Sequence, residues 1–165
     1  MPDEVTVRAA TPDDIEAIVA VFRANLADAS LFQRTAADIA ALLPDYFVAT
    51  RDGGSATIVG CAALSHYPDQ SAELHSVAVL PQWQGQHIGA HLVRAGLQRA
   101  GQTRVWLGTM KPAYFARFGF VPMSPWRIHP RIMLPKIIGV FTQPPARWLP
   151  ALLGGFTFMQ RHNGG

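Results

Sequence analysis

Residues 77–93, VAVLPQWQGQHIGAHLV, decide the fold of this chain. An apolar run ends at Pro81, a turn with two glycines follows, and a helical pattern then runs over 86–100 until Gly101 ends it. A strand, a glycine turn and a helix together present free backbone N–H groups at a helix N-terminus, which favour an anion. The G-x-G-x-x-G pattern of dinucleotide folds and the P-loop pattern are both absent. The stretch therefore predicts an anion-binding turn of another kind.

The residues before this stretch predict strands and helices in alternation. Thr11 and Pro12 give the capping signal of a first helix, whose apolar residues fall on one stripe. The expected elements are a strand over 5–10, helices over 11–29 and 35–43, a hairpin over 46–67 turning at Asp52-Gly53-Gly54, and a strand over 71–80.

The residues after it predict two more strands around a short helix, then an unusual segment. Seven prolines fall between Pro122 and Pro150, and two tryptophans lie among them. So long a connection is expected to be a flap over the site or a contact between two copies in a homodimer. The expected elements are a strand over 103–108, a helix over 112–118 ended by Gly119, a strand over 120–123, an insertion over 124–155 with helical turns at 134–141 and 146–153, and a strand over 156–162.

Length and composition fit one α/β domain over residues 1–165. The N-terminus shows no signal-peptide pattern, and no apolar run is long enough to span a bilayer, so we expect a cytoplasmic protein without a membrane partner. The single cysteine, Cys61, lies in a strand-like stretch and is expected to be a buried structural thiol. No metal site is expected.

Charge is distributed unevenly along the chain. All eleven acids lie at or before Glu73, where four arginines accompany them, whereas ten Lys and Arg residues and no acid follow. The first part therefore carries −7 and the second +10, which points to an anionic partner for the second part. A phosphorylated cofactor, a carboxylate substrate, a nucleic acid or an acidic membrane would each satisfy it. No nucleic-acid motif is present, so nucleic acid is not expected.

The motif Val77-Ala78-Val79, with Gln84 and Gly89 after it and AYFARFGF (113–120) further on, resembles the GCN5-related N-acetyltransferase (GNAT) family over residues 5–123. The resemblance implies a mixed, mostly antiparallel sheet flanked by helices, with acetyl-CoA as co-substrate. It also implies that the strand backbone holds the pantetheine arm and that the N–H groups of residues 85–90 hold the pyrophosphate. The cofactor-binding residues expected from it are Val77, Ala78, Val79, Gln84, Gly85, Gln86, His87, Ile88, Gly89 and Ala90.

His87 departs from the family pattern, which has glycine at this position. Backbone donors make the binding contacts, so a histidine with helical φ would be accommodated. A left-handed φ, or a side chain pointing inward, would weaken the site.

Glu73 is the expected general base for the attacking amine, because it lies four residues before Val77 and a glutamate serves there in some family branches. Strand alternation predicts that Glu73, His75, Val77 and Val79 share one face. The alternative for Glu73 is a structural ion pair, and His75 is the second candidate base. Thr109 is expected near the leaving sulfur, although solvent could also supply the proton. The family's tyrosine position is Phe115 here, and Tyr114 is expected to be core.

The aromatic pattern resembles the branch that acetylates glutamate and related amino acids. This implies transfer of an acetyl group to the primary amine of a small, carboxylate-bearing molecule. Arg117 and Arg127 are the expected carboxylate ligands, with Lys111 and Arg131 as further candidates. The alternatives are a degenerate acyl-CoA-binding sensor or scaffold of the same fold, and a basic nucleic-acid-binding module.

Overall fold

The computed structural model describes residues 4–28, 31–51, 57–150, 153 and 155–162, and their strands form one mixed sheet. The strand order is β1-β2-β3-β4-β5-β7-β6, and every neighbouring pair is antiparallel except β4 with β5. This confirms the expected fold class. The strands are β1 (Val5–Ala9), β2 (Tyr46–Arg51), β3 (Thr57–His66), β4 (Ser71–Val79), β5 (Arg104–Thr109), β6 (Val121–Pro122) and β7 (Thr157–Arg161).

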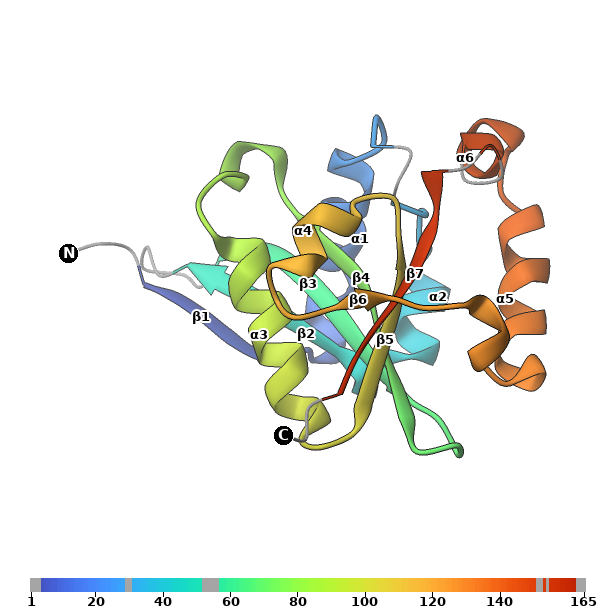
Figure 1. Cartoon of the computed structure of the whole chain (residues 1–165). Helices are drawn as coiled ribbons and strands as arrows, with labels where there is room; N and C mark the ends of the chain where they lie inside the picture. Colours follow the sequence, from blue (N-terminus) through green and yellow to red (C-terminus); the bar gives the residue numbers. More distant parts are fainter. Residues whose placement is uncertain (1–3, 29–30, 52–56, 151–152, 154, 163–165) are drawn as a thin grey trace.

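Helices cover both faces of the sheet (Figure 1). One core joins α3 to residues such as Phe47 and Leu74, and the other joins α1 and α2 to residues such as Tyr46 and Cys61. We call these the α3 face and the α1 face. The helices are α1 (Ile15–Ala24), α2 (Ala36–Ala41), α3 (Ile88–Ala100), α4 (Pro112–Ala116), α5 (Pro130–Phe141) and α6 (Pro145–Pro150), with 3-10 turns η1 (Pro12–Asp14), η2 (Leu43–Asp45), η3 (Pro81–Trp83) and η4 (Pro125–Arg127).

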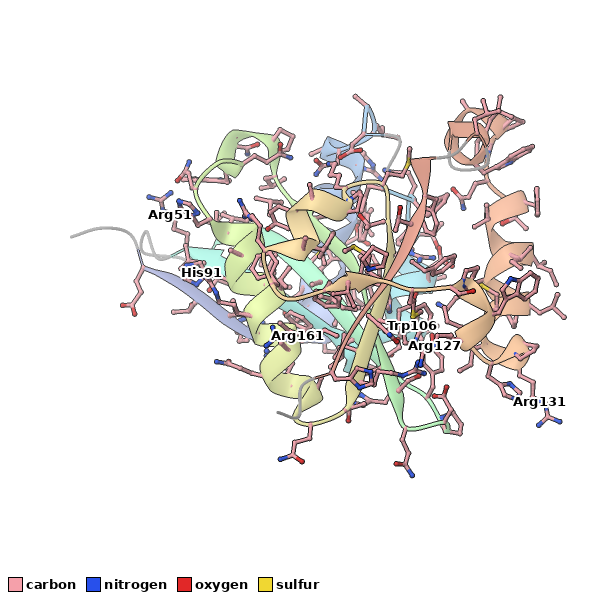
Figure 2. The ribbon with its side chains drawn as sticks, viewed as in Figure 1. Arg51, His91, Trp106, Arg127, Arg131 and Arg161 are labelled. Carbon is pink, nitrogen blue, oxygen red and sulfur yellow. The ribbon has the colours of Figure 1, made fainter. Side chains whose placement is uncertain are left out.

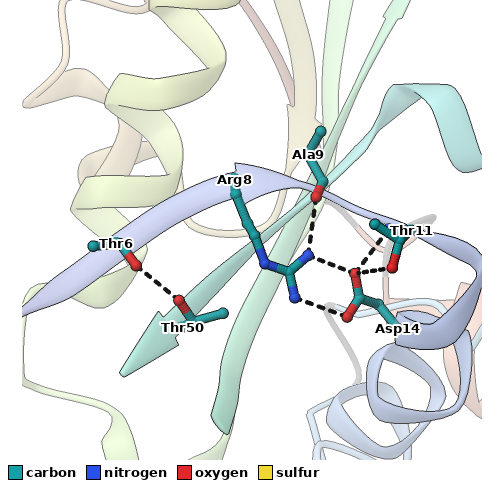
Figure 3. Close-up of polar contacts among 6 residues, drawn as sticks. All are labelled: Thr6, Arg8, Ala9, Thr11, Asp14 and Thr50. Atoms are coloured by element: carbon teal, nitrogen blue, oxygen red, sulfur yellow. Dashed lines mark hydrogen bonds and ion pairs between the residues drawn. The ribbon is translucent and has the colours of Figure 1, made fainter. Parts of the chain in front are cut away.

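The junction between β1 and α1 is fixed by one carboxylate (Figure 3). Arg8 donates to both oxygens of Asp14, at 2.6 and 2.9 Å, and the backbone N–H and hydroxyl of Thr11 donate to the same side chain. The hydrogen bond from Arg8 is the main reason that the pKa of Asp14 falls to about 2. The capping signal predicted at Thr11 is therefore confirmed, although a 3-10 turn precedes the helix proper.

The insertion contains more helix than its sequence suggests. A short helical turn was expected over 134–141, but α5 begins at Pro130 and carries Pro135 inside it. The ring of His129 accepts the N–H of Arg131 and caps this earlier start. The helix expected over 146–153 appears as α6, while residues 151, 152 and 154, like the turn expected at 52–54, lie outside the described residues.

Cys61 lies fully buried in the core of the α1 face, as expected, and burial raises the pKa of its thiol to about 12. The thiol is therefore protonated at neutral pH and suits a structural role. In the described part of the chain, no helix has the length and apolar character needed to cross a membrane.

Candidate active site

The central pocket lies where β4 and β5 separate. The two strands pair only between Ser71–Glu73 and Arg104–Trp106, although both continue further along the chain. A pocket of about 490 Å³ lies in this opening. Its lining comes from residues 74–79 of β4, 107–109 of β5, residues 83–85 and 87–90 at the turn and helix start, Lys111, Tyr114, Phe115 and Arg117 at α4, and Asn25, Asp28 and Leu31 after α1.

A bulge in β4 divides the predicted catalytic face. Cys61 on β3 pairs with Ala78, whereas Ala63, two residues on, pairs with His75, so β4 carries an extra residue here. Ser76 takes a positive φ of 58° within the bulge. The expected shared face is therefore wrong: Val77 and Val79 pack against the core of the α3 face, whereas Glu73 and His75 lie on the α1 face.

The turn before α3 is shaped for an anion, but not in the expected backbone conformation. The helix begins at Ile88 rather than Gln86, and its N-cap His87 has φ 63° and ψ 7°, in the left-handed region. Of the two alternatives for His87, the structure has the left-handed one, and this conformation costs roughly 1–2 kcal/mol for a residue with a Cβ. His87 is exposed and lines the pocket.

The backbone donors remain available for a phosphate. The first hydrogen bond within the helix runs from the N–H of His91 to the carbonyl of His87, at 3.1 Å. The N–H groups of Ile88, Gly89 and Ala90 come before it, so they have no acceptor within the helix. The helix dipole adds to their attraction for an anion.

The two glutamines of the motif have structural partners. Gln84 lines the pocket and donates to the carbonyl of Val79 and to the side chain of Asn25, each at 3.1 Å. Gln86 accepts a hydrogen bond from Arg51 at 2.8 Å and is absent from the pocket lining, and Arg51 also stacks over Trp83. Every other expected cofactor residue lines the pocket.

Glu73 lies beside the pocket, on the α1 face. Its side chain is buried, and its Oε2 accepts the Tyr67 hydroxyl at 2.8 Å and forms an ion pair with Lys136 of α5. The ion pair that we weighed as an alternative therefore exists, with a partner that sequence reasoning did not identify. Lys136 falls in the insertion, where no local pattern links it to β4.

His75 belongs to a directional chain of hydrogen bonds. Ser65 donates to Asp45 at 2.6 Å, so its oxygen accepts from His75 Nε2 at 3.0 Å. Nδ1 then accepts from Ser76 at 2.9 Å, and the Tyr46 hydroxyl donates to Ser76 at 3.2 Å. Burial is the main reason that the pKa of His75 falls to about 4. The ring is therefore neutral at pH 7 and lines the pocket.

Two hydroxyl groups face the part of the pocket formed by β5 and α4. Thr109 Oγ1 accepts the N–H of Lys111 at 2.9 Å, which leaves its own proton available to another acceptor. Tyr114 packs partly against the core, as expected, but it also lines the pocket, and burial raises its pKa. Phe115 lines the pocket without a polar group.

The predicted carboxylate ligands are not brought together. Arg117 lies at the pocket rim, with its guanidinium 4.8 Å from the centre of the Tyr114 ring. Arg127 is exposed on η4 and Arg131 on the outer part of α5, away from the pocket lining (Figure 2). Lys111 lines the pocket and pairs with Asp28 at 2.8 Å.

Two cations that were not among the predicted carboxylate ligands act on the α1 side of the site. The charges of Lys136 and Arg34 add to the lowering of the pKa of His75 that burial causes, and the charge of Arg34 partly opposes the rise that burial causes in the pKa of Tyr46. Among the described residues, no group of three or more His, Cys, Asp or Glu side chains could hold a metal ion.

Comparison with known proteins places this geometry in a family. The model of the acetyltransferase (GNAT) family matches residues 15–120, so the chain belongs to that family. It is an acetyl-CoA-dependent N-acetyltransferase. The chain is 28% identical over 134 residues to an uncharacterized N-acetyltransferase of Chlorobaculum tepidum, covering 75% of this chain and 84% of that protein.

Three further similarities are to one amino-acid acetyltransferase and two solved structures. The chain is 31% identical over 120 residues to the amino-acid acetyltransferase of Actinobacillus pleuropneumoniae, covering 70% of this chain but only 27% of that protein. Rv2747 of Mycobacterium tuberculosis, solved with CoA and NLQ, superposes with a TM-score of 0.75 at 25% identity, covering 95% of this chain and 98% of that one. N-acetylglutamate synthase of Neisseria gonorrhoeae, solved with CoA and N-acetyl-glutamate, has a TM-score of 0.72 at 22% identity, covers all of this chain and 36% of that one, and shares the fold.

Proposed function

We propose that this enzyme transfers the acetyl group of acetyl-CoA to the primary amine of a small amino acid or a related carboxylate-bearing amine. The observation that carries the proposal is the position of Glu73, a buried carboxylate on the face of β4 opposite Val77 and Val79. The co-substrate and the acceptor can then approach the opening between the strands from opposite faces.

In this proposal, the α3 side of the site binds the co-substrate. The backbone of Val77 and Val79 holds the pantetheine arm, and the N–H groups at the start of α3 hold the pyrophosphate. Thr109 stabilises or protonates the departing thiolate, because its hydroxyl proton is not used by its bond with Lys111. Tyr114 is the second candidate for this role, because its raised pKa keeps it protonated.

The α1 side receives the acceptor. Glu73 takes a proton from the acceptor ammonium, and the neutral amine attacks the thioester carbonyl carbon. The C–S bond then breaks and the thiolate leaves. Arg34 supplies positive charge on this side, which suits an acceptor that carries a carboxylate next to its amine. The relatives named amino-acid acetyltransferases support the same substrate class.

Release of the CoA thiol, measured with a panel of amines, tests this proposal. The panel begins with acidic amino acids and their amides, and includes polyamines and a lysine peptide. We expect turnover with one or more amino acids and little with the polyamines. Tight binding of acetyl-CoA without turnover of any amine would favour the acyl-CoA-binding sensor instead.

A further inference from the structure

We infer that Lys136 occupies the acceptor's ammonium site and that the enzyme acetylates its Nζ. The inference rests on the proposed role of Glu73 as the general base. Lys136 pairs with the carboxylate expected to receive the acceptor's ammonium. It reaches that carboxylate from α5, in the insertion that follows β6.

The surroundings of Lys136 Nζ are those of an ammonium-binding site. The ring centres of Tyr67 and Trp106 lie 5.8 and 5.7 Å from Nζ, and the two rings stack on each other. Aromatic faces attract a cation through their ring electrons, and a buried carboxylate adds charge complementarity. The same groups would bind any primary ammonium.

Sheet register extends this site by one more polar group. Glu73, Trp106 and Gln160 are direct neighbours across β4, β5 and β7, so their side chains point to the same face. Gln160 is 6% exposed, and its Oε1 has no hydrogen-bond partner among the described residues. A buried amide oxygen without a partner is costly, and an N–H group of a bound amine or of the product amide would satisfy it.

The site is also close to the reaction pocket. His75 follows Glu73 by two residues on the same face and lines the pocket. Lys136 is near enough to His75 to lower its pKa. An amine on Glu73 therefore lies at the α1 side of the opening where the thioester would bind.

The reaction needs only acetyl-CoA as co-reactant. Glu73 takes a proton from the Lys136 ammonium, and the Nζ lone pair forms a bond with the thioester carbonyl carbon. The C–S bond breaks, and the thiolate leaves with a proton from Thr109, Tyr114 or solvent. The product is a neutral amide, which cannot form an ion pair with Glu73, so acetylation frees the carboxylate for other acceptors.

The chain provides its own control, because Lys111 is the only other lysine. Its side chain is 60% exposed and lines the same pocket, but it pairs with Asp28 rather than with Glu73. The full-length protein is incubated with isotope-labelled acetyl-CoA and no added amine, and labelling at the two lysines is followed by mass spectrometry after chymotrypsin digestion. The same sample is tested with the amine panel.

We expect Lys136 to be labelled about a hundredfold faster than Lys111, the usual contribution of a general base. E73Q should remove this advantage while leaving acetyl-CoA binding and the Lys111 rate unchanged, and K136R should remove the labelled site. Equal rates at the two lysines in the wild-type protein would overturn the inference, even if E73Q does not fold. Turnover of amines without labelling of Lys136 would overturn it and leave the proposed function standing, whereas labelling without amine turnover would support it and count against the small-molecule function.

Discussion

The hydroxyl of Tyr114 occupies the space that a side chain at residue 89 would need. A Cβ on Gly89 would lie 2.6 Å from Tyr114 Oη, a distance that real Cβ atoms essentially never show. Both residues line the pocket, so the missing side chain at the start of α3 makes room for a hydroxyl group of α4.

Gly89→Ala should therefore displace the Tyr114 ring and disturb the cradle for the pyrophosphate. We expect acetyl-CoA affinity to fall by about tenfold, or about 1.4 kcal/mol, in a calorimetric titration. Tyr114→Phe in the same chain removes the clashing oxygen and should restore most of the affinity. Equal losses in the single and double variants would show that the contact is not the cause.

The opposite change can be made at His87, where a residue with a side chain has a left-handed backbone conformation. His87→Gly should relieve roughly 1–2 kcal/mol of strain, of which the added freedom of the unfolded chain cancels about 0.4–1 kcal/mol. The net gain is a rise of a few degrees at most in the unfolding temperature, with acetyl-CoA affinity retained.

His87→Ala is the matched control, because it removes the imidazole but keeps the Cβ. It should not gain stability. A large loss of acetyl-CoA affinity in both variants would instead mean that the imidazole itself contacts the diphosphate.

Glu73→Gln should slow acetyl transfer while leaving acetyl-CoA binding intact, because Glu73 lies outside the pocket lining. We expect kcat to fall by about 10²–10⁴, with the affinity for acetyl-CoA within about twofold of the wild-type value. Steady-state kinetics and titration of the same preparation measure both quantities. A fall in affinity with unchanged kcat would contradict the role of base.

The fold was predictable because its signals are local. Alternation in the strands, the capping signal at Thr11 and the spacing from Val77 to Gly89 each depend on neighbouring residues, and the structure confirms the order of elements they predict. The pocket at the start of α3 follows from the same local pattern.

The catalytic face was predicted less well, for physical reasons. A single extra residue at the β4 bulge reverses alternation, so Glu73 and Val77 point to opposite faces, and nothing in the letters around Ser76 indicates it. The partner of Glu73 is Lys136, which lies 63 residues further along the chain, in the insertion. Such a contact depends on tertiary packing, which periodicity does not report.

The neutral state of His75 predicts a stability profile. Its pKa is about 4 in the folded protein, set by burial together with Glu73, Lys136, Arg34 and Asp45, against about 6.5 in an unfolded chain. The unfolded state therefore binds more protons between these values, and the free energy of unfolding falls as pH falls from about 6.5 to about 4.

Urea unfolding at several pH values measures this profile. In His75→Asn the fall over that window should be shallower, because the titrating group is gone. Asp14, with its pKa of about 2, stabilises the folded protein throughout this window and loses that contribution mainly below about pH 4. The assignment would be refuted if the free energy of unfolding changed with pH by the same slope in the wild-type protein and in His75→Asn between pH 4 and 6.5.

Thr109→Val tests the leaving-group side, since valine keeps the shape and removes the hydroxyl. We expect kcat to fall by about a hundredfold, with a smaller effect for Tyr114→Phe. If CoA release showed a larger fall in kcat for Tyr114→Phe than for Thr109→Val, Tyr114 would be the proton donor.

The central claim, that the acceptor carries a carboxylate beside its amine, is tested most directly by comparing matched substrates. The measurement is kcat/KM of the wild-type enzyme for an amino acid and for the amine that remains after its α-carboxylate is removed. The account predicts at least about tenfold higher kcat/KM for the amino acid, the effect of about 1.4 kcal/mol of charge-assisted binding. Equal or faster acetylation of the decarboxylated amine would contradict it.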